Sequence, residues 1–120
     1  MKIDLEDDEA QKQIVHSLCK MILKCIKNNE KGVVIVQHDP ELMLFVSSAA
    51  QELKCLLSAG VGEFIDTLLF MSVNEKANSN ALIEVIRHDD IQNYIVAGII
   101  PEHIVNALIE YFPVADVNEC

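Results

Sequence analysis

The chain has 120 residues, of which 51% are apolar and 23% charged, enough hydrophobic material for one compact domain. Nineteen acidic residues against nine basic ones give a net charge of −10, which argues against nucleic acid and membrane as partners because nucleic acid and anionic lipid would both be repelled. No apolar run approaches the roughly 18 residues of a membrane-spanning helix, and no secretory signal opens the chain. We therefore expect an intracellular protein, cytoplasmic or also nuclear, with reduced cysteines.

The first third of the chain predicts one firm helix and one ambiguous segment. Residues 1–9 form an acidic lead-in, where negative charge favours the start of a helix. Apolar side chains then recur at helical spacing over 14–26, with lysines on the opposite face. The run Val33–Val36 is β-branched and fits either a buried strand or one turn of a packed helix.

The remaining chain reads as further helices separated by polar or glycine-containing turns. Asp39 and Pro40 have the form of an N-cap and a first helical residue. Apolar spacing then predicts helices over 40–57, 63–72, 81–97 and 101–112. Residues 67–73 would also tolerate a strand, and 87–90 form a polar turn within 81–97. Residues 114–120 are expected to be a frayed tail. This interpretation gives a single helical domain over 10–113.

The two halves of the sequence resemble each other, which suggests an internal repeat. With an offset of 60 residues, 26–30 falls on 86–90 and 34–36 on 94–96, and one residue later Pro40 falls on Pro101. The second copy resembles the junction between armadillo repeats, in which an Ala-Gly turn is followed by a helix that opens with Ile-Pro. The residues that carry this resemblance are Ile91, Gln92, Ile95, Ala97, Gly98, Ile100, Pro101, Val105 and Leu108.

The resemblance implies an all-α fold of stacked helical hairpins, similar to an armadillo or HEAT array. Two and a half repeat units are short for an independent array, so we expect self-association or a place in a longer repeat protein. The chain has no Trp and lacks the Asn ladder with which armadillo arrays bind basic localisation peptides. That ligand is therefore not carried over.

A second resemblance competes with the first. Residues 31–61 are similar to the PUB domain, which binds the C-terminal tail of the AAA ATPase valosin-containing protein. That resemblance implies an α+β fold with a small antiparallel sheet and a strand at 33–37. The chain departs from the pattern at Gly32, Val33, Val34 and Asp39, and the ATPase tail is acidic. The matching residues are Lys31, Ile35, Leu42, Val46, Leu53, Leu56, Gly60 and Val61.

Candidate catalytic and metal-binding residues are few. His16 and Cys19 lie three residues apart on the first helix and could offer two metal ligands, but a zinc site needs three or four. Their neighbours supply no second pair at ligand spacing, so the cysteines are expected to pack as small apolar residues. We predict no enzyme activity, no cofactor and no metal. A small His and Cys metal protein or enzyme is the remaining alternative.

The surplus of apolar residues is the best indication of function. Five consecutive apolar residues over 42–46 cannot share one helix face, so this segment is buried on two sides or contacts a partner. We therefore predict a protein-interaction or scaffold module that binds a basic or amphipathic segment of a protein partner. The predicted binding residues are Lys31, Asp39, Leu42, Gly60, Val61, His88 and Asp89.

Overall fold

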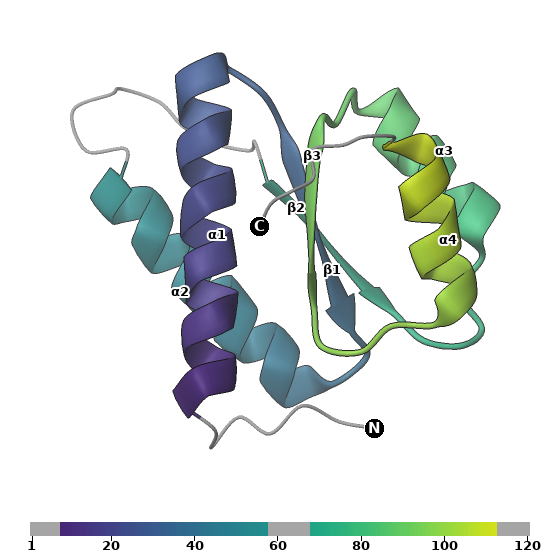
Figure 1. The fold of residues 1–120 in the computed structure, drawn as a ribbon, viewed down its shortest axis with the longest axis horizontal. Helices are drawn as coiled ribbons and strands as arrows, with labels where there is room; N and C mark the ends of the chain where they lie inside the picture. The colour runs from purple at the N-terminus through teal and green to yellow at the C-terminus, as the bar shows by residue number, and fades with distance from the viewer. Residues whose placement is uncertain (1–7, 58–67, 113–120) are drawn as a thin grey trace.

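Helices and strands alternate along the chain in the computed structural model, which describes residues 8–57 and 68–112 (Figure 1). The order is α1 (Asp8–Asn28), β1 (Gly32–Gln37), α2 (Pro40–Leu57), β2 (Leu68–Val73), α3 (Ser79–His88), β3 (Asn93–Ala97) and α4 (Glu102–Tyr111).

The three strands form one parallel sheet with the order β2-β1-β3. Gly32 at the start of β1 is level with Leu68 on one side and with Asn93 on the other. The connection from β1 to β2 and the connection from β2 to β3 run in opposite directions across the sheet. Since parallel crossovers are right-handed, the two connecting helices belong on opposite faces.

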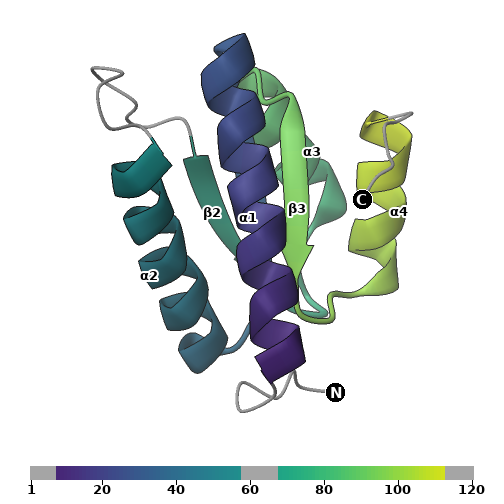
Figure 2. The ribbon, with the colours of Figure 1, turned by 60° about the vertical axis from the view of Figure 1, so that its left-hand side comes forward.

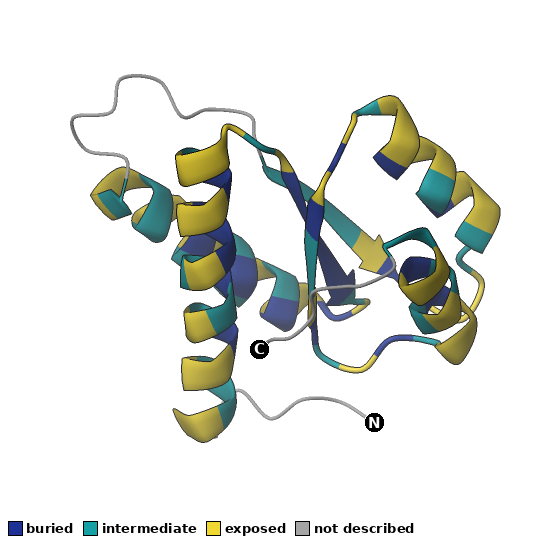
Figure 3. Ribbon diagram, turned by 45° about the horizontal axis from the view of Figure 1, so that its top comes forward, coloured by how far each residue is buried: buried dark blue, intermediate teal, exposed yellow. Residues whose placement is uncertain are grey.

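The helices cover the sheet on both faces, as Figure 2 shows. Helices α1 and α2 pack together over one face, where they enclose Val34 and Val36 of β1. Helices α3 and α4 pack over the other face, against Val33 and Ile35. Alternate residues of β1 therefore enter two different cores, and five of its six residues are buried (Figure 3).

This architecture corrects the expected fold class. The protein is not an all-α stack of helical hairpins, because three parallel strands separate its helices into two layers. The strand expected at 33–37 by the PUB-like alternative is present, and the class of helices with a sheet fits that alternative. The antiparallel pairing that it implied is wrong, since both strand pairs are parallel.

Two of the expected helices are also corrected. Within the expected helix 63–72, residues 68–72 belong to strand β2, which agrees with the strand allowed for 67–73. The expected helix 81–97 is a helix, a turn and a strand. The polar turn expected at 87–90 is present at its last two residues, where Asp90 takes a left-handed conformation with φ of 57°. The helices expected over 14–26 and 40–57 are confirmed, and that over 101–112 is confirmed with α4 at Glu102–Tyr111.

The two turns that precede β1 and β3 share one geometry. Asn29 after α1 and Asp90 after α3 both have positive φ, of 56° and 57°. In each turn the next backbone N–H donates to a carbonyl five residues earlier, Glu30 to Cys25 and Ile91 to Ile86, with N···O distances of 3.0 and 3.1 Å. The helix-strand-helix order is thus present twice, in α1-β1-α2 and in α3-β3-α4.

Some expectations fall on residues that the structure does not describe. These are most of the acidic lead-in, the tail at 114–120, and the candidate binding residues Gly60 and Val61. Asp8 and Glu9, the last two residues of the expected lead-in, already belong to α1. Over the described ranges, 8–57 and 68–112, no helix has the length and apolar character needed to cross a membrane.

Candidate functional site

The carboxyl ends of β1 and β3 lie where parallel sheets of this kind usually bind ligands. In a doubly wound parallel sheet, ligands bind where adjacent strands lead to helices on opposite faces. Here β1 leads to α2 on one face and β3 to α4 on the other. The side chain of Gln37 fills this position, and its Oε1 accepts a hydrogen bond from the backbone N–H of Ile99 at 2.8 Å. A Cβ atom on Gly98 would lie 2.6 Å from that oxygen, so the strand ends are closely packed.

A histidine and a serine meet beside this closed position. The Nδ1 of His38 and the Oγ of Ser72 are 3.0 Å apart, and the backbone N–H of His38 donates to the carbonyl of Val73. A catalytic pair of this kind needs a third group that orients the imidazole. Among the described residues, the second ring nitrogen of His38 makes no hydrogen bond. We therefore interpret the pair as a link between the ends of β1 and β2.

The five predicted binding residues that the structure describes lie at opposite ends of the sheet. Asp39 is 6% exposed at the carboxyl end, where its Oδ1 accepts from the backbone N–H of Glu41, so the predicted N-cap is confirmed. Leu42 is fully buried below it. At the amino end, His88 and Asp89 contact each other at 3.2 Å, and the backbone of Lys31 bonds to Gln92. The structure does not bring these residues into one site.

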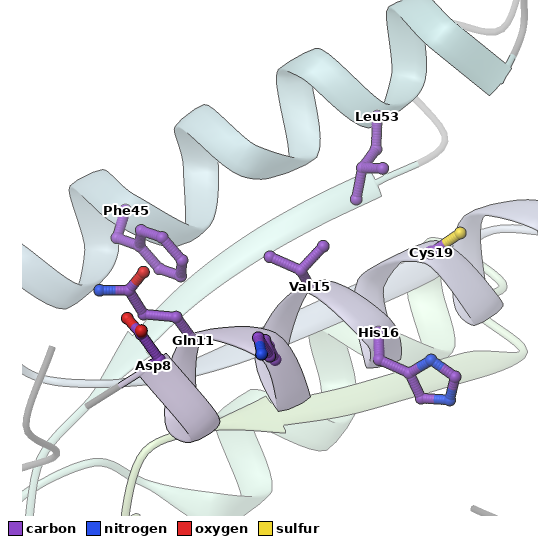
Figure 4. Close-up of a pocket in the computed structure, with 8 residues that line it drawn as sticks. Asp8, Gln11, Val15, His16, Cys19, Phe45 and Leu53 are labelled. Carbon is purple, nitrogen blue, oxygen red and sulfur yellow. The ribbon is translucent and has the colours of Figure 1, made fainter. Parts of the chain in front are cut away.

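A groove between α1 and α2 is the more open feature of the described surface (Figure 4). It has a volume of about 660 Å³. Val15 of α1 points toward α2, where it faces Phe45 and Leu53 across the groove. The lining residues are Asp8, Gln11, Lys12, Val15, His16, Cys19, Phe45 and Leu53.

Helical periodicity explains why these side chains share a groove. Gln11, Val15 and Cys19 are four residues apart and form one line along α1. Phe45 and Leu53 are eight residues apart on α2, with the small side chain of Ala49 between them. Both helices are anchored on their inner sides by buried residues, so the groove is built on rigid elements.

The groove offers shape and hydrophobic contact rather than reactive chemistry. His16 and Cys19, the candidate metal ligands, both line it, but His16 points away from α2 (Figure 4). Within residues 8–57 and 68–112, no three His, Cys, Asp or Glu side chains are arranged to hold a metal ion. The arrangement is suited to the apolar face of a partner.

Sequence reasoning singled out this region only in part. It flagged the apolar run 42–46, in which Leu42 and Val46 are buried and Phe45 is half-buried in the groove. Leu44 is 66% exposed on the other side of α2, away from the core. Val15 was assigned to an amphipathic helix, and no sequence signal showed that its neighbour across the groove would be Phe45.

The comparisons with known proteins add nothing to this site. No family model, no curated protein and no solved structure matches the chain. The function must therefore be argued from the geometry of the described residues.

Proposed function

We propose that this protein is a non-enzymatic interaction module that binds an amphipathic helix of a protein partner in the groove between α1 and α2. The observation that supports this proposal is the groove itself, in which apolar side chains from two anchored helices lie open to solvent. Helix-in-groove recognition uses such a surface, because the apolar face of a partner helix covers it.

The composition of the groove supports a helix rather than a small molecule. Val15, Phe45 and Leu53 supply apolar contacts along the two helices, and polar groups from Asp8 and Gln11 lie at one end. A partner helix would place residues at i, i+3 or i+4 and i+7 against this line. Enclosed, mostly apolar cavities are typical of small-molecule sites, and this groove is open along its length.

Photo-crosslinking tests the proposal. A photoreactive amino acid at Cys19, which lines the groove on the same side of α1 as Val15, is compared in cells with the same group at Gln51, which is exposed six residues after Phe45 on α2. Mass spectrometry then identifies the attached segments. We expect the Cys19 probe to attach to one partner segment with an amphipathic helical pattern, at least about tenfold above the Gln51 probe.

Two substitutions on α2 distinguish binding in the groove from non-specific hydrophobic binding elsewhere on the surface. Leu53→Glu places a charge in the groove and should abolish the adduct at Cys19. Leu44→Glu changes an exposed leucine outside the groove and should preserve the adduct. Circular dichroism checks that both variants keep the melting temperature within a few degrees. The proposal is contradicted if the two variants give equal amounts of adduct. It is also contradicted if the crosslinked partner segments lack the apolar spacing of an amphipathic helix.

The PUB-like alternative predicts a different attached segment. It is favoured over a helical repeat by the strand β1 that follows Lys31. Under that alternative, the crosslinked segment is the C-terminal tail of an AAA ATPase. The same experiment therefore distinguishes the two functions.

A further inference from the structure

Basic charge is concentrated in α1, whereas the protein as a whole is acidic. The longest run of the chain without an acidic residue is 10–29, and it contains Lys12, Lys20, Lys24 and Lys27. All four lysines are exposed. In a protein with a net charge of −10, the surface of this helix therefore carries the opposite sign of charge.

Three of these lysines share one side of α1 with an exposed leucine. At about 100° per residue, Lys20, Leu23, Lys24 and Lys27 lie within about 100° of the helix circumference and about 10 Å of its length. Exposed residues follow the side of α1 that is turned away from the sheet (Figure 3). We call these four residues the outer face of α1.

The outer face is separate from the groove. Among the groove residues of α1, His16 already points away from α2 (Figure 4). Lys20 follows His16 by four residues and therefore lies on the same side of the helix. None of the four residues of the outer face lines the groove.

The fold makes little use of these side chains. Within residues 8–57 and 68–112, no ion pair involves Lys20, Lys24 or Lys27, and Leu23 is 47% exposed and belongs to neither core. A lysine near the carboxyl end of a helix stabilises the helix dipole, but only Lys27 lies in the last turn. The remaining lysines and the leucine are available to a partner.

We infer that the outer face of α1 is a second docking site, which binds an acidic protein segment that carries a bulky apolar residue. The carboxylates of such a segment pair with the lysines, and its apolar residue covers Leu23. Charge complementarity favours an acidic occupant over a basic one. The inference does not rest on the groove, so either site can fail without the other.

A short acidic segment fits the outer face better than a nucleic acid or a membrane. Interactions between exposed charges fade beyond about 8 to 10 Å at physiological salt, so a bound segment senses mainly the three adjacent lysines. A long polyanion or an anionic bilayer extends beyond them and meets the acidic remainder of the protein. A single exposed leucine also gives a bilayer little apolar surface to take up.

Three designed peptides of about 14 residues, long enough to span the outer face as a helix, test the inference. They share one central Leu and carry Glu, Gln or Lys at the same flanking positions. Binding is measured by fluorescence anisotropy, and NMR shift changes locate the site. We expect the Glu peptide to bind at least about tenfold more tightly than the Lys peptide at about 50 mM salt, with less difference at about 500 mM.

Matched substitutions assign the contacts to the outer face. Lys24→Glu should weaken binding of the Glu peptide by about three- to tenfold, whereas Lys76→Glu, the same charge change in the turn after β2, should alter it less than about twofold. Leu23→Ala should weaken it by at least about threefold, and Leu44→Ala, at an exposed leucine of α2, should leave it unchanged. Thermal unfolding followed by circular dichroism checks that each variant is folded.

Several outcomes would overturn the inference. The charge selection is wrong if the Gln peptide binds as tightly as the Glu peptide, or if the Lys peptide binds more tightly. The site is wrong if no peptide shifts resonances of the outer face at about 1 mM, or if the shifts are confined to groove residues such as Val15 and Phe45. Anionic vesicles and a 20-nucleotide single strand serve as competitors. Displacement of the Glu peptide by either one would show that the outer face binds polyanions in general.

The crosslinking experiment on the groove gives an independent readout. Lys24→Glu should leave the adduct at Cys19 unchanged, because Lys24 does not line the groove. Leu53→Glu, which should abolish that adduct, should in turn leave binding of the Glu peptide unchanged. Loss of both kinds of binding in either variant would show one site instead of two and would overturn the inference.

Discussion

Asn93 is the residue that joins the two turns before β1 and β3. It is 8% exposed, and its Nδ2 donates to Glu30 Oε1 at 3.0 Å and to the carbonyl of Lys31 at 3.3 Å. The same nitrogen lies 3.7 Å from the Sγ of Cys25. Buried polar groups are costly unless bonded, so this amide holds two segments about sixty residues apart in sequence. Nothing in the sequence marks Asn93 for this role, because the contact exists only once β1 and β3 pair.

The thiol of Cys25 gives this cluster a measurable pH dependence. Burial, and secondarily the nearby charge of Glu30, raises the pKa of Cys25 from 9.0 to about 11. The unfolded chain then loses the proton at a lower pH than the folded one. The stability contributed by the neutral thiol is complete below pH 9 and is lost as pH rises toward 11.

We predict that the free energy of unfolding of the wild type falls relative to that of Cys25→Ala by about 2 kcal/mol between pH 8 and pH 11. Urea unfolding at several pH values measures this difference. Cys55→Ala, at an exposed cysteine, is the matched control and should show a constant difference from the wild type. A constant difference for Cys25→Ala as well would contradict the raised pKa.

At the scale of elements, the helices were more predictable than the strands. The helix over 14–26 shows the period of 3.6 because only one side of α1 faces the core. Strand β1 has cores on both faces, so its run Val33–Val36 lacks the alternation that identifies half-buried strands. The polar run 87–90 indicated a turn, but residues 81–97 kept an apolar spacing on both sides of it, so the strand that follows Asp90 was predicted to be helix. The groove could not be predicted, because it exists only once α1 and α2 pack against each other, and no sequence signal paired these two helices.

The connection from β3 to α4 depends on Gly98. Its φ of 88° is rare for other residues, and a Cβ atom there would lie 2.7 Å from Leu42 Cδ2 as well as close to Gln37. Gly98→Ala should lower the free energy of unfolding by at least about 1 kcal/mol. Gly32→Ala should cost less, because the atom it would approach at 2.9 Å is the flexible Met21 thioether. Urea midpoints at constant m-value measure both, and a larger loss at Gly32 would contradict this account.

At the scale of the whole molecule, β1 is the element that both cores share. Val34 contributes to the core beneath α1 and α2, and Ile35 contributes to the core beneath α3 and α4. Neither helix layer can bury its apolar side without this strand. The predicted single domain over 10–113 therefore has a physical basis in one central strand, although its parts lie on two faces. We expect the two layers to unfold together.

This expectation can be tested by a destabilising substitution in the core on one face of the sheet and a measurement of amide protection in the helices on the other face. Ile35→Ala removes buried methyl and methylene groups under α3 and α4 and should lower the free energy of unfolding by about 2 to 4 kcal/mol. Hydrogen exchange then compares the slowest amides of α4 with those of α1, which lies on the opposite face. If the domain is one cooperative unit, both sets lose the same protection, because each exchanges through the same global opening.

Leu44→Ala, at a leucine 66% exposed outside both cores, is the control and should leave protection in both layers within about 0.5 kcal/mol of the wild type. The decisive comparison is α1 in Ile35→Ala. Since Ile35 packs in the other core, α1 can lose protection only through the shared strand. Wild-type exchange in α1 alongside faster exchange in α4 would show that the layers open separately, and the groove would then belong to a unit that is stable without α3 and α4.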